Sequence, residues 1–93
     1  MSHPPDTSST PAVEIAGRSM EPTLPAGSVV WVDHGSRAAE PGDVILIEGS
    51  QSPIIHRVVH HAGSGNSSLV YHRGDFEGGI GIAAGSAVLG TVV

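Results

Sequence analysis

The chain has 93 residues, no cysteine and a formal net charge of −5, and its four basic residues are all arginine. This length corresponds to one small domain, the lack of cysteine excludes disulfides and thiolate metal sites, and the acidic balance disfavours nucleic acid and anionic membranes as partners. No apolar run approaches the ~18–20 residues that cross a bilayer, and the N-terminus does not resemble a signal peptide. We therefore expect no membrane span in this chain and a cytoplasmic location.

The chain begins with a polar segment, residues 1–11, whose Ser, Thr and Pro content predicts a disordered tail before a single β-domain at residues 12–93. Residues 12–15 form a candidate first strand. The segment from Gly17 to Gly27 follows, and its prolines, Pro22 and Pro25, exclude both a helix and a central strand. We expect this segment to be a stiff, extended and partly exposed loop that presents Ser19.

Five further segments are rich in β-branched or aliphatic residues and are bounded by Gly and Pro turn signals, which predicts strands at 28–33, 44–48, 54–60, 69–72 and 87–93. Between them we expect a loop with one helical turn over 35–40, a hairpin loop over 62–68 and an irregular Gly-rich stretch over 76–85. Six short strands without helical periodicity predict an all-β fold.

Ser19 is a candidate nucleophile, but a serine hydroxyl needs a neighbouring base. Arginine stays protonated and cannot act as that base, and the chain has no lysine. The base must be a histidine or a carboxylate with a shifted pKa. In strand alternation Ile54, His56, Val58 and His60 share one face. The position of His56 fits a base, and it equally fits a structural histidine at the edge of the core.

Two aspartates, Asp43 and Asp75, each follow a glycine at the edge of a strand. Either carboxylate could orient His56, and either could simply bind turn N–H groups; the residues alone do not choose between them. A zinc site built from His56, His60, His61 and His72 is the weaker alternative, because His60 and His61 point to opposite faces and no cysteine completes the ligand set. We expect no metal and no cofactor.

Four segments, taken in order, resemble the superfamily of type I signal peptidases and LexA-like self-cleaving repressors. They are Gly-Arg-Ser-Met-Glu-Pro-Thr-Leu at 17–24, Pro-Gly-Asp-Val-Ile at 41–45, Ile-His-Arg-Val-Val at 55–59 and Arg-Gly-Asp at 73–75. The closing residues 88–93 are also similar, and the resemblance covers about residues 13–93.

The resemblance implies a serine endopeptidase in a compact, mixed β-barrel-like fold that acts on a peptide or protein. Ser19 matches the nucleophile and Asp75 the aspartate of the family's Gly-Asp motif, while His56 looks like the histidine base of the endoplasmic-reticulum-type branch. Substrate would lie extended beside Met20 and Pro22. Gly17 stands where many signal peptidases have an oxyanion-binding serine, so backbone N–H groups, including that of Ser19, would bind the oxyanion.

The sequence also departs from the family pattern. Phe76 replaces the usual asparagine after the Gly-Asp motif, and we expect neither the membrane anchor nor the accessory β-domain of the bacterial enzymes. The glycine at position 17 and the expected lack of an anchor favour one alternative, a catalytically weak or inactive β-domain that binds extended peptides. A second alternative is self-cleavage at one of the Ala-Gly pairs, as in the repressors.

Overall fold

The computed structural model describes residues 12–34, 38–64, 67–76 and 78–93. Their regular structure consists of seven strands and one short 3-10 helix, Gly85–Ala87. The strands are β1 (Ala12–Glu14), β2 (Val29–Asp33), β3 (Val44–Ile47), β4 (Ile54–Ala62), β5 (Leu69–Arg73), β6 (Gly81–Ala84) and β7 (Val88–Val92). The predicted all-β fold is confirmed.

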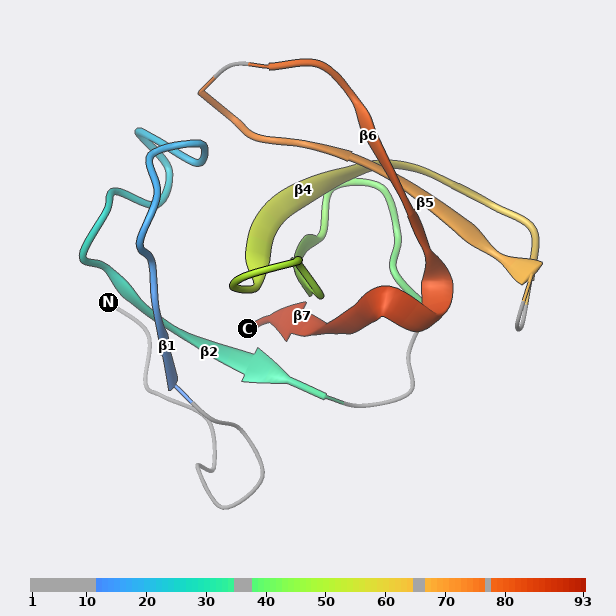
Figure 1. Ribbon diagram of the computed structural model, residues 1–93, viewed down its shortest axis with the longest axis horizontal. Coiled ribbons are helices and arrows are strands. Elements are labelled where there is room, and N and C mark those ends of the chain that lie inside the picture. The colour runs from blue at the N-terminus through green and yellow to red at the C-terminus, as the bar shows by residue number, and fades with distance from the viewer. Residues whose placement is uncertain (1–11, 35–37, 65–66, 77) are drawn as a thin grey trace.

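All strands belong to one sheet with the order β1-β2-β7-β3-β4-β5-β6. Every pairing is antiparallel, so the mixed strand directions expected from the resemblance do not occur in the described residues. The sheet coils into a compact body (Figure 1), but β1 and β6 lie at its two edges and leave it open.

The six predicted strands are present, and each boundary differs from the prediction by at most two residues. The prediction missed β6, a Gly-Ile-Ala-Ala segment inside the stretch that we expected to be irregular. Its intrinsic strand propensity is weak, but it pairs with β5 over four residues, from Leu69↔Ala84 to His72↔Gly81, and this pairing overrides local preference. The predicted tail and part of the predicted helical turn at 35–40 lie outside the described residues.

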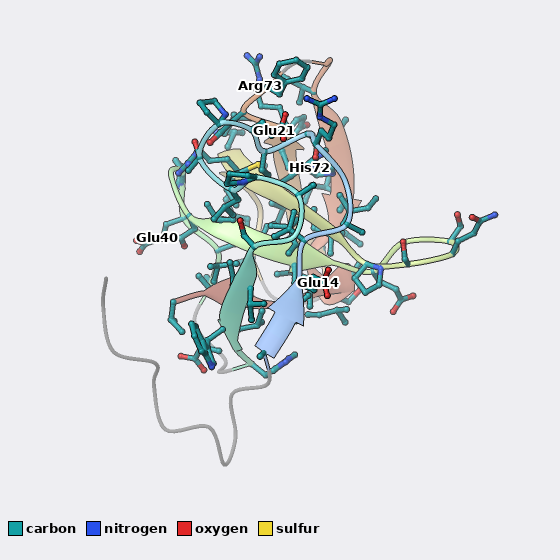
Figure 2. All side chains as sticks on the ribbon, turned by 90° about the vertical axis from the view of Figure 1, so that its left-hand side faces the viewer. Glu14, Glu21, Glu40, His72 and Arg73 are labelled. Carbon is teal, nitrogen blue, oxygen red and sulfur yellow. The ribbon has the colours of Figure 1, made fainter. Side chains whose placement is uncertain are left out.

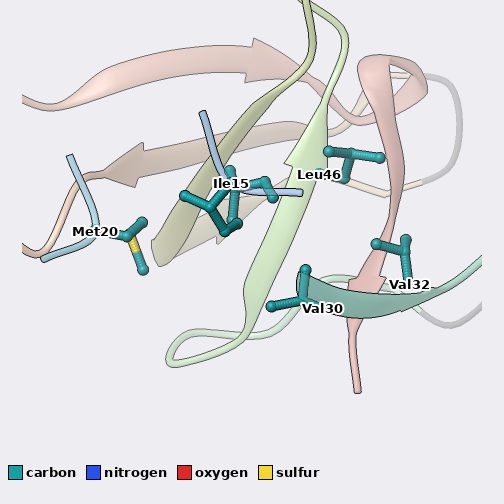
Figure 3. Packing of buried hydrophobic residues seen from close by; sticks show 6 residues of the cluster. Ile15, Met20, Val30, Val32 and Leu46 are labelled. Carbon is teal, nitrogen blue, oxygen red and sulfur yellow. The ribbon is translucent and has the colours of Figure 1, made fainter. Parts of the chain in front are cut away.

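Apolar side chains form two clusters. Successive side chains of a strand point to opposite faces of the sheet, so neighbouring residues such as Ile45 and Leu46 belong to different clusters. One contains Ile15, Met20, Val30, Val32, Leu46 and Ile55, and Figure 3 shows this cluster from close by. The other contains Ala39, Ile45, Ile47, Val58 and Val70. Met20, only 1% exposed, belongs to a loop, and burying such a side chain contributes roughly 1.5–3 kcal/mol. The core therefore anchors the segment that carries Ser19.

Within the described ranges, no helix combines the length and hydropathy that a membrane crossing requires.

Candidate active site

The loop after β1 is folded into turns, so the prediction of an extended segment is wrong. The Glu21 N–H donates to the Arg18 carbonyl at 3.1 Å, and the Leu24 N–H donates to the Met20 carbonyl at 2.8 Å. The Met20 side chain is buried in the core, and the backbone turns around it instead of running straight across the surface. Ser19, which is half-buried, thus lies next to a residue whose side chain is held in the core.

A second segment, Gly74 to Phe76, packs against Ser19. The Phe76 N–H donates to the Ser19 carbonyl at 2.8 Å. Gly74 is buried, and a Cβ at position 74 would lie only 2.9 Å from the Ser19 Cβ. In Figure 2, the loop that carries Glu21 and the end of β5 with His72 and Arg73 lie at the same end of the molecule. The Gly-Asp motif therefore supports the loop that presents Ser19.

Arg57 connects this motif to the turn before β3. Its Nε and Nη2 donate to Asp75 Oδ1 and Oδ2 at 2.9 and 2.8 Å, and its Nη1 donates to the Gly42 carbonyl at 2.8 Å. The Arg57 hydrogen bond lowers the pKa of Asp75, and a hydrogen bond from Thr23 adds to that lowering. Hydrogen bonds through Arg57 and Asp75 thus link all four motif segments.

Asp43 has a different position. Its Oδ2 accepts the Glu40 N–H at 2.9 Å, and its carbonyl accepts the Val58 N–H at 2.8 Å. These bonds close the turn between Glu40 and Asp43 and attach it to β4. Of the two aspartates that the sequence left open, Asp75 is the one that lies against the Ser19 loop.

His56 contacts a second histidine. Its Nδ1 lies 2.9 Å from Nδ1 of His72, and the ring centroids are 5.1 Å apart. The register pairs His72 with Val58, so His56 and His72 are diagonal neighbours on one face. Burial, followed by the nearby His72, lowers the pKa of His56, whereas the charge of Asp75 raises it.

Asp75 reaches His56 through its charge, since its side-chain hydrogen bonds go to Arg57 and Thr23. The sequence placed His72 with His56 only as a ligand of the alternative zinc site, not as its hydrogen-bond partner. The shared face of the two rings depends on the register shift between Val58 and His60, which pairs His72 with Val58, and composition does not reveal such a shift.

His60, predicted to share the strand face of His56, lies on the opposite face, because the register shift between Val58 and His60 reverses the alternation there. His60 is exposed and its ring packs against Tyr71 with centroids 5.5 Å apart. Among the residues that the structure describes, no group of three or more His, Cys, Asp or Glu side chains is arranged to hold a metal ion.

A cavity of about 280 Å³ opens beside Ser19. Its walls come from β1, from the loop that follows it and from the start of β4, and are formed by Val13, Glu14, Ile15, Ala16, Gly17, Ser19, Met20, Ser52, Pro53, Ile54 and Ile55. Met20, expected to contact substrate, contributes to this wall from the core. Pro22, the other residue expected there, is exposed and lies outside this lining.

The model of the family described as Peptidase S24-like matches residues 3–69. "Signal peptidase complex catalytic subunit SEC11" of Arthroderma benhamiae is 34% identical over 68 residues, which are 71% of this chain and 34% of that protein. The protein of the same name from Yarrowia lipolytica is 33% identical over 70 residues, 73% of this chain and 41% of that protein.

A third similar protein, also named signal peptidase complex catalytic subunit SEC11, comes from Saccharomyces cerevisiae and is 31% identical over 75 residues, 77% of this chain and 45% of that protein. The chain therefore matches less than half the length of each of these relatives. No solved structure matches the chain significantly. The superfamily predicted from the four sequence segments is confirmed.

Proposed function

Because the chain belongs to the Peptidase S24-like family, we propose that it is a serine endopeptidase that cleaves a peptide or a leader segment, with Ser19 as nucleophile and His56 as general base. The observation that carries this proposal is the packing of Gly74 and Phe76 against Ser19, with the Arg57–Asp75 pair behind them. This packing holds the backbone and Cβ of Ser19 beside an apolar cavity, which suits a residue that presents a nucleophile.

In the proposed reaction the Ser19 Oγ attacks the scissile carbonyl carbon as its proton passes to His56. The tetrahedral intermediate collapses, the C–N bond breaks, and His56 returns the proton to the leaving amine. A water molecule, activated by the same imidazole, then hydrolyses the acyl-enzyme ester. His56 enters this cycle neutral, in agreement with its lowered pKa, and the charge of Asp75 favours the imidazolium that forms.

The oxyanion would be bound by backbone N–H groups, with that of Ser19 as one donor. Position 17, which lines the same cavity, is a glycine and offers no hydroxyl. An enzyme with one donor fewer would turn over slowly, because each such donor typically contributes about 10²–10³ in rate.

Substrate would bind as an added strand. β1 lies at an edge of the sheet formed by the described residues, and an extended peptide would pair with the outer side of this strand. The cavity next to β1 is small and lined mainly by Val, Ile, Ala, Met and Pro, which favours small apolar residues before the cut. The printed name of the SEC11 relatives, a signal peptidase subunit, makes leader peptides the first substrates to test.

The test uses a fluorophosphonate probe, which reacts with activated serines, together with a panel of leader peptides. Labelling at Ser19 and cleavage after small residues are expected for the wild-type chain. Both should fall to background in Ser19→Ala and in His56→Ala. If either variant retains wild-type labelling and cleavage, the assignment of the dyad is wrong.

A second candidate function is a non-catalytic domain that binds extended peptides in the same cavity. Gly17 favours it, because the residue leaves the oxyanion site without a side-chain donor. Saturable peptide binding by a wild-type chain that neither labels nor cleaves would support this function over the peptidase.

A further inference from the structure

The short contact between His56 and His72 has a specific geometry that the peptidase proposal does not use. His72 is 8% exposed and sits on β5, directly opposite Gly81 of β6. A Cβ at position 81 would lie 2.6 Å from His72 Cε1 and 2.9 Å from its Nε2. The glycine therefore leaves room for the ring of His72, and the ring is confined on the side away from His56.

An Nδ1–Nδ1 hydrogen bond requires that one ring donates and the other accepts. If His72 donates, then neutral His56 carries its proton on Nε2, and its unprotonated Nδ1 accepts the hydrogen bond from His72. Neither nitrogen of His56 is then able to take another proton without breaking this bond. If His56 donates from Nδ1, its Nε2 keeps a free lone pair. Only the second arrangement leaves His56 with a nitrogen that can take the Ser19 proton.

We propose that His72 is the positioning residue of the site, accepting the Nδ1–H of His56 and so holding the Nε2 of His56 as the proton acceptor. This inference rests on the proposed function, in which His56 is the base. His72 then fills the position that a carboxylate occupies in a serine–histidine–aspartate triad. It fixes the tautomer and orientation of His56, and Asp75, bound to Arg57, supplies negative charge from a further position.

The surroundings support a neutral acceptor at His72. Burial lowers the pKa of His72 as well as that of His56. Asp75, just after β5, acts on His56 through its charge, and Arg57 and Arg73 in turn act on Asp75. When His72 takes up a proton on Nδ1, it can no longer accept the Nδ1–H of His56. Neutral His56 can then pair with it only by accepting at Nδ1 with its own proton on Nε2, so Nε2 is lost as the proton acceptor. The two rings titrate as a coupled pair with two macroscopic steps.

The first experiment observes tautomers directly, by two-dimensional ¹H–¹⁵N NMR of the full chain with ¹⁵N-labelled histidine at about pH 7.5. Expected are a protonated Nδ1 on His56 and an unprotonated Nδ1 on His72. A protonated Nδ1 on His72 with an unprotonated Nδ1 on His56 overturns the inference. This readout does not depend on catalytic activity.

The second experiment measures the pH dependence of labelling and cleavage. His72→Phe, which cannot accept a hydrogen bond, should lower the rate about 10–100-fold and shift the acid limb of the profile. His72→Asn, whose side-chain oxygen can accept the same proton, should recover a large part of the rate. His60→Phe, at an exposed histidine on β4, is the control and should leave the rate and the pH profile unchanged.

The outcomes separate the two proposals. If Ser19→Ala and His56→Ala retain activity, the peptidase mechanism fails, and the NMR result still decides the pairing. If those variants are inactive but His72→Phe keeps the wild-type rate and profile, only the role of His72 is overturned. If His72→Phe does not fold, the recovery seen in His72→Asn and the tautomers of the wild-type chain decide the matter.

Discussion

Gly74 lies so close to Ser19 that position 74 has no room for a side chain, since a Cβ there would approach the Ser19 carbonyl oxygen and lie 2.9 Å from the Ser19 Cβ. The Gly-Asp motif therefore has two functions in one turn. Its glycine allows the turn to touch the Ser19 loop, and its aspartate ties the turn to Arg57. The backbone bond from Phe76 to Ser19 completes the contact.

The first prediction concerns this contact. Gly74→Ala should displace the Ser19 loop, because both neighbouring atoms belong to backbone or Cβ positions that cannot rotate away. We expect labelling of Ser19 to slow about 100-fold, the scale on which a 1 Å misplacement acts, and stability to fall by about 1–3 kcal/mol. Fluorophosphonate labelling rates and urea denaturation measure the two effects.

Gly79→Ala is the matched control, since a Cβ at position 79 has no neighbour within 4 Å. Position 79 lies in the same part of the chain, and this substitution should change neither the labelling rate of Ser19 nor the stability appreciably. Wild-type labelling in Gly74→Ala would show that the close contact does not position Ser19.

The second prediction concerns position 17, which has open space around it. A Cβ at Gly17 would have no neighbour within 4 Å, and the residue lines the cavity together with Ser19. Gly17→Ser should therefore fit and add a hydroxyl donor for the oxyanion, raising kcat/KM by about tenfold or more, within the range that such donors contribute. Cleavage of a leader peptide at several substrate concentrations gives kcat and KM separately.

Gly17→Ala separates the hydroxyl from the added Cβ and should not raise the rate. An equal gain in both variants would mean that loop rigidity, rather than a new donor, explains the effect.

The third prediction concerns Arg57, whose guanidinium binds both oxygens of Asp75 and the Gly42 carbonyl. Lysine keeps the charge but cannot make this bidentate contact, so Arg57→Lys should lower stability by about 1–2 kcal/mol, a value already reduced for partial exposure to solvent. It should also slow labelling of Ser19. Arg73→Lys, at an exposed arginine on β5, is the control, and an equal loss of stability there would contradict the special role of Arg57.

Much of the fold follows from local sequence. The β-branched runs bounded by Gly and Pro placed six strands correctly, and the order of four motifs indicated the superfamily. β6 could not be found in this way, because its Gly-Ile-Ala-Ala sequence becomes a strand only through pairing with β5. The conformation of the Ser19 loop was also missed, since burial of Met20 is a tertiary effect that its two prolines do not reveal.

In the candidate site, too, the sequence predicts the residue types but not their contacts. The absence of lysine pointed to a histidine base, and the motif pointed to Asp75, but neither indicates which groups touch. That Asp75 binds Arg57, and that His56 meets His72, depends on the register of β4 with β5 and its shift near Val58. Long-range register of this kind is set by pairing and packing across the sheet, so it has no local signature.

The last prediction is a dependence of stability on pH. Burial lowers the pKa of His56 and of His72 in the folded chain, whereas both titrate near 6.5 when unfolded. Below about pH 6.5 the unfolded chain thus binds more protons than the folded one, and the free energy of unfolding must fall as the pH falls toward the lowered folded values. Above about pH 7.5 this contribution is fully present and constant.

Urea denaturation at intervals from pH 8 to pH 5 measures this dependence. His56→Asn and His72→Asn should each flatten the slope in that window, while the exposed His60→Asn should leave it unchanged. The contribution of Asp75 appears in a separate window. Its pKa is lowered by Arg57, so its stabilising effect is present above about pH 4 and is lost only at lower pH. A slope between pH 8 and pH 5 that is identical in wild type and both histidine variants would contradict the buried, neutral state of the pair.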